Sequence, residues 1–234
     1  MKTVAFLVLL IGCFACKSET KGDKNNNSSV CVNPNVEFFY PICDSARFYV
    51  YRNMVNGLNE EFHRVYKVED SKGPHVVVER YASDGRLLEA LNYNIDSLDL
   101  IDHMVVNLRK EKEQAILYKN KLFPFDINKE INFASKFRGV NDSTVILKEI
   151  SRKFSKKTQM LYLQRKLETL IFKDYIRLTN LNIYERKEEE RIGEEVVYFA
   201  KGLGLTEWHS PTKSVHFKLE KVISQKQWVQ LMQQ

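Results

Sequence analysis

The sequence predicts a mainly β protein, with a large curved antiparallel sheet that forms a partial barrel or a sandwich, and a short C-terminal helix. Three observations lead to this prediction. Stretches rich in aromatic and β-branched residues recur at regular spacing from residue 46 onward, separated by turn-forming residues. Hydrophobic residues make up 44% of the chain and aromatic residues 12%, which is enough to build a core. Helical periodicity is clear only near the C-terminus.

The chain begins with a pattern typical of a secretory signal. Lys2 precedes the unbroken apolar run Val4–Ile11, which is too short to span a membrane. Leu10-Ile11-Gly12-Cys13 resembles the bacterial lipobox. That resemblance implies cleavage before Cys13, a diacylglycerol thioether on Cys13 and an acylated amine, so residues 1–12 are a lipoprotein signal peptide. A core helix with an incidental cysteine is the alternative, and Cys16 fits the lipobox less well.

The expected location is the cell envelope, with the chain anchored to the membrane by lipid. Position 14 is Phe rather than the Asp that retains lipoproteins of enteric bacteria at the inner membrane, so we expect the outer membrane of a Gram-negative bacterium. Residues 13–30 are expected to be a lipidated flexible tether, because Lys17–Val30 lacks aromatic residues and is almost wholly polar. Residues 31–234 are then a single β-rich domain.

Cys31 and Cys43 are candidates for a disulfide, since the cell envelope permits oxidation. Closing this loop would contribute about 3 kcal/mol on the loop-entropy model. Two unpaired cysteines that pack as small hydrophobic residues are an equal alternative. No metal site is expected, because the sequence holds no CxxC and no nearby pair of histidines.

The first part of the domain reads as a meander of strands. Its predicted strands are Ala46–Val55, Leu58–Glu69, Pro74–Ala82 and Arg86–Asn94, and Asn56-Gly57 is a strong hairpin signal between the first two. The next segment, 97–108, fits either a helical face or a strand, and we expect extended structure with a turn.

The second part of the domain predicts further strands and then a helix. The strands are expected at 143–154, 158–164, 167–172, 175–186, 195–200 and 214–223. Ser224 caps the predicted helix, in which Trp228, Leu231 and Met232 share one side.

Two stretches in this second part carry a family resemblance. Thr169–Leu178 resembles a strand-turn-strand of secreted bacterial β-proteins, and Tyr198-Phe199-Ala200-Lys201-Gly202-Leu203-Gly204-Leu205 resembles their Y-x-A-K-G-x-G-L-V segment. The group is the TapB-like lipoproteins of unknown function, whose half-barrel is similar to LolA and LolB. The likeness covers residues 46–223, and it departs where the family has A-G-T-F and this chain has Glu168–Phe172. The group brings no established catalytic residues.

Four residues of the second motif are singled out as structural: Tyr198, Lys201, Gly202 and Gly204. Two glycines around Leu203 inside a strand predict a bulge that bends the sheet. The alternative, a phosphate-binding loop, lacks the third glycine, a following helix and a Lys-Ser/Thr pair.

No residue pattern points to catalysis, and no cofactor is expected. His209 and His216 flank a predicted hairpin loop, but a third metal ligand is missing. The glutamates at 188–190, 194 and 195 form a charge run typical of a solvated hairpin, although such a run also offers paired carboxylates. The formal net charge is +6, and acids interleave with the basic residues, which argues against nucleic acid as a partner.

Three Asp-Ser pairs resemble the O-glycosylation sequon of some Gram-negative secreted proteins. They place Ser45, Ser97 and Ser143 as acceptors, with turn and cap chemistry as the alternative reading.

The preferred functional hypothesis is a non-enzymatic lipoprotein whose sheet binds an envelope protein or an apolar ligand. The alternative is a secreted hydrolase that acts on glycan or peptide. A cleft with two carboxylates about 5 to 10 Å apart would favour the hydrolase, and a curved sheet lined with apolar side chains would favour the binding protein.

Overall fold

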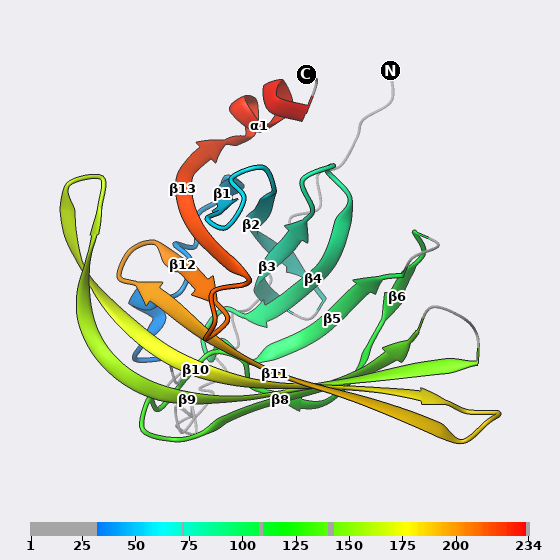
Figure 1. The fold of residues 1–234 in the computed structure, drawn as a ribbon. Helices are drawn as coiled ribbons and strands as arrows, with labels where there is room; N and C mark the ends of the chain where they lie inside the picture. Colours follow the sequence, from blue (N-terminus) through cyan, green and yellow to red (C-terminus); the bar gives the residue numbers. More distant parts are fainter. Residues whose placement is uncertain (1–31, 72, 108–109, 140–142, 233–234) are drawn as a thin grey trace, which may run out of the picture. The chain divides into compact units, whose positions relative to one another are not determined.

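A computed structural model describes residues 32–71, 73–107, 110–139 and 143–232. Within these ranges the chain forms one antiparallel sheet of 13 strands, with one short helix at its C-terminal end (Figure 1). This confirms the predicted fold class. The elements are η1 (Val36–Phe38), β1 (Arg47–Asn53), β2 (Glu60–Asp70), β3 (Gly73–Tyr81), β4 (Leu87–Asn94), β5 (Leu100–Val106), β6 (Lys112–Gln114), β7 (Ile116–Asn120), β8 (Ile131–Arg138), β9 (Thr144–Tyr162), β10 (Arg165–Asn182), β11 (Lys187–Ala200), β12 (Gly204–His209), β13 (His216–Ser224) and α1 (Gln225–Met232).

The sheet curls so far that its two edges come close together. The strand order is β6-β5-β4-β3-β2-β1-β13-β12-β11-β10-β9-β8-β7, so the edge strands β6 and β7 follow each other in the chain. Ala115 alone separates them, and its amide donates a hydrogen bond to the His103 carbonyl at 2.8 Å. Close to this junction, at the C-terminal end of β8, the Arg138 amide donates to a Glu113 carboxylate oxygen at 3.1 Å. The sheet is therefore a nearly closed barrel, which leaves little exposed edge.

The interior of this barrel holds the main core. Aromatic side chains from both halves of the sheet meet there, and the segment before β1 fills one part of it: Phe38, Phe39 and Tyr40 are all buried. Phe39 packs edge-on against Tyr93 and Phe123 at ring distances of 5.0 and 5.1 Å. The strands thus wrap around a plug, Phe38–Tyr40, which precedes β1 in the chain.

The helix α1 covers a second, smaller core on the outer face of the sheet. Trp228 stacks on Phe48 at 4.7 Å and meets Phe62 edge-on at 5.0 Å. Ser224 and Gln227 form the capping box, because the Ser224 amide donates to the Gln227 side-chain oxygen at 2.9 Å. The predicted C-terminal helix and its cap are confirmed. Among the described residues, no helix is both long enough and apolar enough to cross a lipid bilayer.

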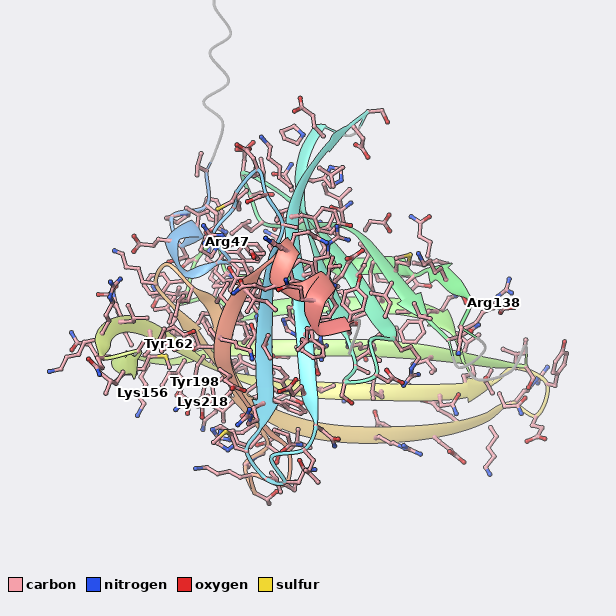
Figure 2. The ribbon with its side chains drawn as sticks, turned by 90° about the horizontal axis from the view of Figure 1, so that it is seen from above. Arg47, Arg138, Lys156, Tyr162, Tyr198 and Lys218 are labelled. Atoms are coloured by element: carbon pink, nitrogen blue, oxygen red, sulfur yellow. The ribbon has the colours of Figure 1, made fainter. Side chains whose placement is uncertain are left out.

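The predicted boundaries of the later strands were wrong. Five short segments between 143 and 200 are three long strands, β9, β10 and β11, and the resemblance to a strand-turn-strand at Thr169–Leu178 lies inside the unbroken strand β10. Figure 2 shows Lys156 and Tyr162 near one end of these strands and Arg138 at the other. Polar runs such as Ser155-Lys156-Lys157 stay extended because the long strands pair with each other beyond the core. Strands β6, β7, β8 and β12 were not predicted.

Gly202 and Gly204 do not form a bulge inside a strand. Gly202 lies in the tight turn between β11 and β12, and Gly204 is the first residue of β12; both adopt positive φ angles, +75° and +86°. The Gly202 amide donates to the Glu37 carbonyl at 2.8 Å, and the Lys201 ammonium pairs with the Glu37 carboxylate at 2.8 Å. The turn therefore holds the segment that carries the buried aromatic plug.

We expect Gly204→Ala to be less stable than Gly202→Ala by about 1 to 3 kcal/mol. Both substitutions force an L-residue into the left-handed region, which costs about 1 to 2 kcal/mol. A Cβ at 204 would also come within 2.8 Å of the Tyr40 ring and 2.9 Å of its Cα, whereas one at 202 meets open space. Urea unfolding of the two variants measures the difference, and equal stabilities would show that Tyr40 does not pack against this turn.

Candidate functional site

The barrel interior contains a cavity of about 320 Å³. Most of its wall is apolar or aromatic, with side chains such as Phe123, Phe133, Phe199 and Trp208. One part of the wall is charged, which is unusual for the inside of a small domain. The charged lining residues are Arg80, Glu89, Lys148, Arg152, Asp174 and Glu195.

The charged residues form two rows of cross-strand neighbours on the inner face of the sheet. His63, Arg80 and Glu89 are paired in register across β2, β3 and β4. Arg152, Asp174 and Glu195 are paired in register across β9, β10 and β11. Successive side chains of a strand point to opposite faces of the sheet. Each of these residues therefore points into the barrel, as do the apolar residues two positions before or after it.

The first row is organised around Glu61. His63 Nε2 donates to Glu61 at 2.8 Å, and Tyr40 donates its hydroxyl proton to His63 Nδ1 at 2.7 Å. The Arg80 guanidinium binds the same Glu61 oxygen at 2.7 Å. Burial alone would raise the pKa of Glu61, but Arg80 and His63 outweigh it and bring the pKa to about 2. Burial lowers the pKa of His63, which fits a neutral ring that accepts from Tyr40.

Glu89 links the two walls of the barrel. One of its oxygens contacts the Arg80 guanidinium, and the other lies 3.1 Å from both Lys148 Nζ and His103 Nε2. His103 is fully buried, and the Ser135 hydroxyl lies 3.1 Å from its Nδ1. Burial opposes the charge on Glu89, yet Lys148 and Arg80 hold its pKa well below the usual range. The Lys148 contact joins β9 to β4 across the interior.

Arg152 and Asp174 form a buried bidentate ion pair in the second row. Arg152 Nε and Nη2 each donate to a different Asp174 oxygen at 2.7 Å. The guanidinium also lies over the Phe199 ring at 5.1 Å. Burial disfavours the charge on Arg152, but Asp174 outweighs burial and raises the pKa of Arg152. This geometry satisfies both charges without a ligand.

Glu195 and Tyr93 differ from the other polar groups of the cavity wall. In the part of the chain that the structure describes, neither the Glu195 carboxylate nor the Tyr93 hydroxyl has a hydrogen bond or an ion pair. Tyr93 is only 5% exposed. Burial, and then the neighbouring Asp174 charge, raise the pKa of Glu195. These two side chains are therefore free to bind a molecule inside the cavity.

The residues singled out from the sequence lie elsewhere. Cys13 and Cys31 fall outside the described residues, so the lipid anchor and the pairing with half-buried Cys43 stay predictions. Tyr198 is half-buried, and its hydroxyl lies 3.3 Å from His209 Nε2. The His209 and His216 rings lie 5.4 Å apart in the β12–β13 hairpin. No group of three or more His, Cys, Asp or Glu within the described residues is arranged to hold a metal ion.

The three candidate glycosylation sites lie in turns or bends. Ser45 is exposed, whereas Ser97 and Ser143 are half-buried. Ser97 Oγ accepts a hydrogen bond from the Asp99 amide at 3.2 Å, as a turn residue does. Modification at these serines stays a prediction.

The charged lining of the cavity was missed at the sequence level, although a signal was present. In β10, Asp174 falls in the same alternating phase as Leu170, Phe172, Ile176 and Leu178. A charged residue within an apolar phase indicates a buried, paired charge. In β4, Glu89 likewise points to the same face of the strand as the apolar residues Leu91 and Tyr93.

Comparison with known proteins shows the fold but no family. No family model matches the chain, and no curated protein matches it. A candidate lipoprotein from Parabacteroides distasonis has a similar fold, with a TM-score of 0.50 and 12% identity over 80% of this chain and 98% of that one. The resemblance to TapB-like lipoproteins has no support at the level of sequence families; the shared β fold is what the comparison establishes.

Two further structures are less similar. A candidate exported protein with a YmcC-like fold from Bacteroides fragilis has a TM-score of 0.41 and 14% identity, covering 80% of this chain and 99% of that one. The hypothetical lipoprotein YmcC from Escherichia coli has a TM-score of 0.35 and 8% identity, covering 81% of this chain and 94% of that one.

Proposed function

We propose that this chain is a lipid-anchored protein of the bacterial cell envelope that binds one small amphipathic molecule inside its barrel. Cys13 would carry the lipid, and residues 13–30 would tether the domain to the outer membrane. The bound molecule is held and not chemically changed.

The cavity is the observation that carries this proposal. Ligand sites are usually concave spaces of about 300 to 1,000 Å³ with mainly apolar walls and a few well-placed polar groups. The barrel interior offers about 320 Å³ with this composition. Its size suits a molecule with one short apolar chain, and its charged wall suits a polar head.

The envelope location has separate support. The lipobox-like segment and the polar tract after it are typical of an exported lipoprotein. The Parabacteroides distasonis protein with a similar fold is itself described as a candidate lipoprotein. The binding role expected from the sequence is consistent with a barrel whose core leaves a cavity open.

Leu178→Trp is expected to weaken binding of n-octanol about tenfold or more. Leu178 lines the cavity and is 36% exposed, so a larger side chain there would close the cavity without disturbing the buried core. Leu181→Trp is the matched control, because Leu181 is 38% exposed on the opposite face of β10 and does not line the cavity. Calorimetric titration measures both, and equal binding by the two variants would place octanol outside the barrel.

A secreted hydrolase is the second candidate, and one observation favours it. Asp174 and Glu195 are direct cross-strand neighbours in the cavity wall, and their surroundings differ: Asp174 forms an ion pair with Arg152, whereas Glu195 has no such partner among the described residues and burial raises its pKa. The cavity thus combines a carboxylate pair with an apolar lining. Mass spectrometry of glycan and peptide mixtures incubated with the protein tests this; cleavage that Glu195→Gln abolishes would favour the hydrolase over the binding protein.

A further inference from the structure

The carboxylates around the cavity outnumber the arginine and lysine side chains that face them. Four carboxylates lie in its wall or directly behind it, and three cations face them. The carboxylates are Glu61, Glu89, Asp174 and Glu195, and the cations are Arg80, Lys148 and Arg152. His63 hydrogen-bonds to Glu61 and His103 to Glu89, so neither ring is paired with Asp174 or Glu195. One carboxylate is therefore left without an arginine or lysine partner, and a buried charge without a partner is costly.

The carboxylate without a cationic partner is Glu195. Arg80 is shared by Glu61 and Glu89, Lys148 binds Glu89, and Arg152 is occupied on two nitrogens by Asp174. Glu195, next to Asp174, is without a partner among the residues that the structure describes. Tyr93 presents a second unpaired group to the same space, and it is more than nine-tenths buried.

We infer that the molecule bound in the cavity is a single-chain amphipathic amine, that Glu195 pairs with its protonated amine, and that Tyr93 hydrogen-bonds to its polar head. The apolar part of the wall then holds the chain. This inference rests on the proposed function and specifies its ligand class.

An anionic head group fits the cavity less well. Every cation in the wall already has a carboxylate partner, so an anion would have to break an existing ion pair. An anion would also lie close to Glu195 and Asp174, which repel it. A neutral head group would leave Glu195 without a cationic partner.

Binding of the amine should depend on pH through Glu195. The groups that act on it are Asp174 on β10, Arg80 on β3, Lys148 and Arg152 on β9, and Glu61 on β2. Since burial and Asp174 favour its protonated form, part of the binding energy displaces a proton. Affinity for the amine therefore falls as the pH drops through the raised pKa of Glu195, while an alkylamine stays protonated throughout.

The test compares three probes of equal chain length by calorimetric titration: n-octylamine, n-octanol and n-octanoate. We expect the wild-type domain to bind octylamine about tenfold more tightly than octanol, and octanoate more weakly than either. Glu195→Gln should lose about tenfold in affinity for octylamine and little for octanol, and its octylamine affinity should no longer fall at acidic pH. Tyr93→Phe should weaken octylamine binding less than Glu195→Gln does.

Glu194→Gln is the matched control, because it removes the same charge from the adjacent, exposed position of β11. Octanol binding by Glu195→Gln reports that its cavity is intact. If octanol or octanoate binds wild type as tightly as octylamine, or if Glu195→Gln keeps full affinity for octylamine, the amine inference is wrong although the cavity is a binding site. If none of the three probes binds, the proposed function itself is wrong.

Discussion

Replacing Asp174 by Asn is expected to lower the free energy of unfolding by about 3 to 5 kcal/mol. Asp174 and Arg152 are 3% and 8% exposed at their side chains, and two hydrogen bonds of 2.7 Å join them. The substitution leaves the Arg152 guanidinium buried without its counter-charge, and that unpaired charge accounts for most of the loss. Urea unfolding at neutral pH measures the change.

Two further variants test whether the loss of stability comes from burial of the Arg152–Asp174 pair or from the loss of any ion pair. Glu190→Gln breaks the exposed Arg177–Glu190 pair between β10 and β11, and it should change stability by at most about 1 kcal/mol. The double variant Arg152→Met/Asp174→Leu should be more stable than Asp174→Asn, because no buried charge remains. A loss of less than about 1 kcal/mol for Asp174→Asn would mean that this pair is open to solvent.

Acid should destabilise the domain as carboxylates of the inner wall are protonated. Glu61 has a pKa of about 2 in the folded chain, below its ordinary value of 4.5. A lowered pKa stabilises the fold above the unfolded value, and the contribution is lost as the pH falls from about 4.5 to about 2. At about 1.4 kcal/mol per pKa unit, Glu61 contributes about 3 kcal/mol at neutral pH. Glu89 acts in the same direction.

Glu61→Gln should therefore remove about 3 kcal/mol at neutral pH and make the dependence on pH shallower in the acid range. Glu60→Gln is the neighbouring control, since that side chain lies on the other face of β2. Urea unfolding at a series of pH values compares both variants with wild type. If the two variants lose the same free energy of unfolding and show the same dependence on pH, Glu61 does not have the lowered pKa described above.

The fold class could be predicted from local sequence patterns. The ends of the long strands β9, β10 and β11 could not. The meander from β1 to β4 was readable because Asn56-Gly57 and Asp84-Gly85 mark its turns. The β9–β10 turn at Leu163-Gln164 has no such signal, because both residues adopt positive φ without glycine. Long strands that pair beyond the core carry polar residues on both faces, and alternation does not reveal their ends.

The candidate site could be predicted only in part. The apolar inner wall follows from the alternation of each strand. The partners of the buried charges do not, because Lys148 reaches Glu89 across 59 positions of sequence and the contact depends on how far the sheet curls. The plug Phe38–Tyr40 was missed because no periodicity places a loop inside a barrel.

The most direct test of the amphipathic cavity is a crystal structure of the domain with ω-bromooctylamine, in which anomalous scattering locates the bromine. We predict a bromine site inside the barrel among the apolar side chains, with the amine about 2.7 to 2.9 Å from a Glu195 oxygen. A bromine site on the outer surface, or an amine that points away from Glu195, would contradict the account.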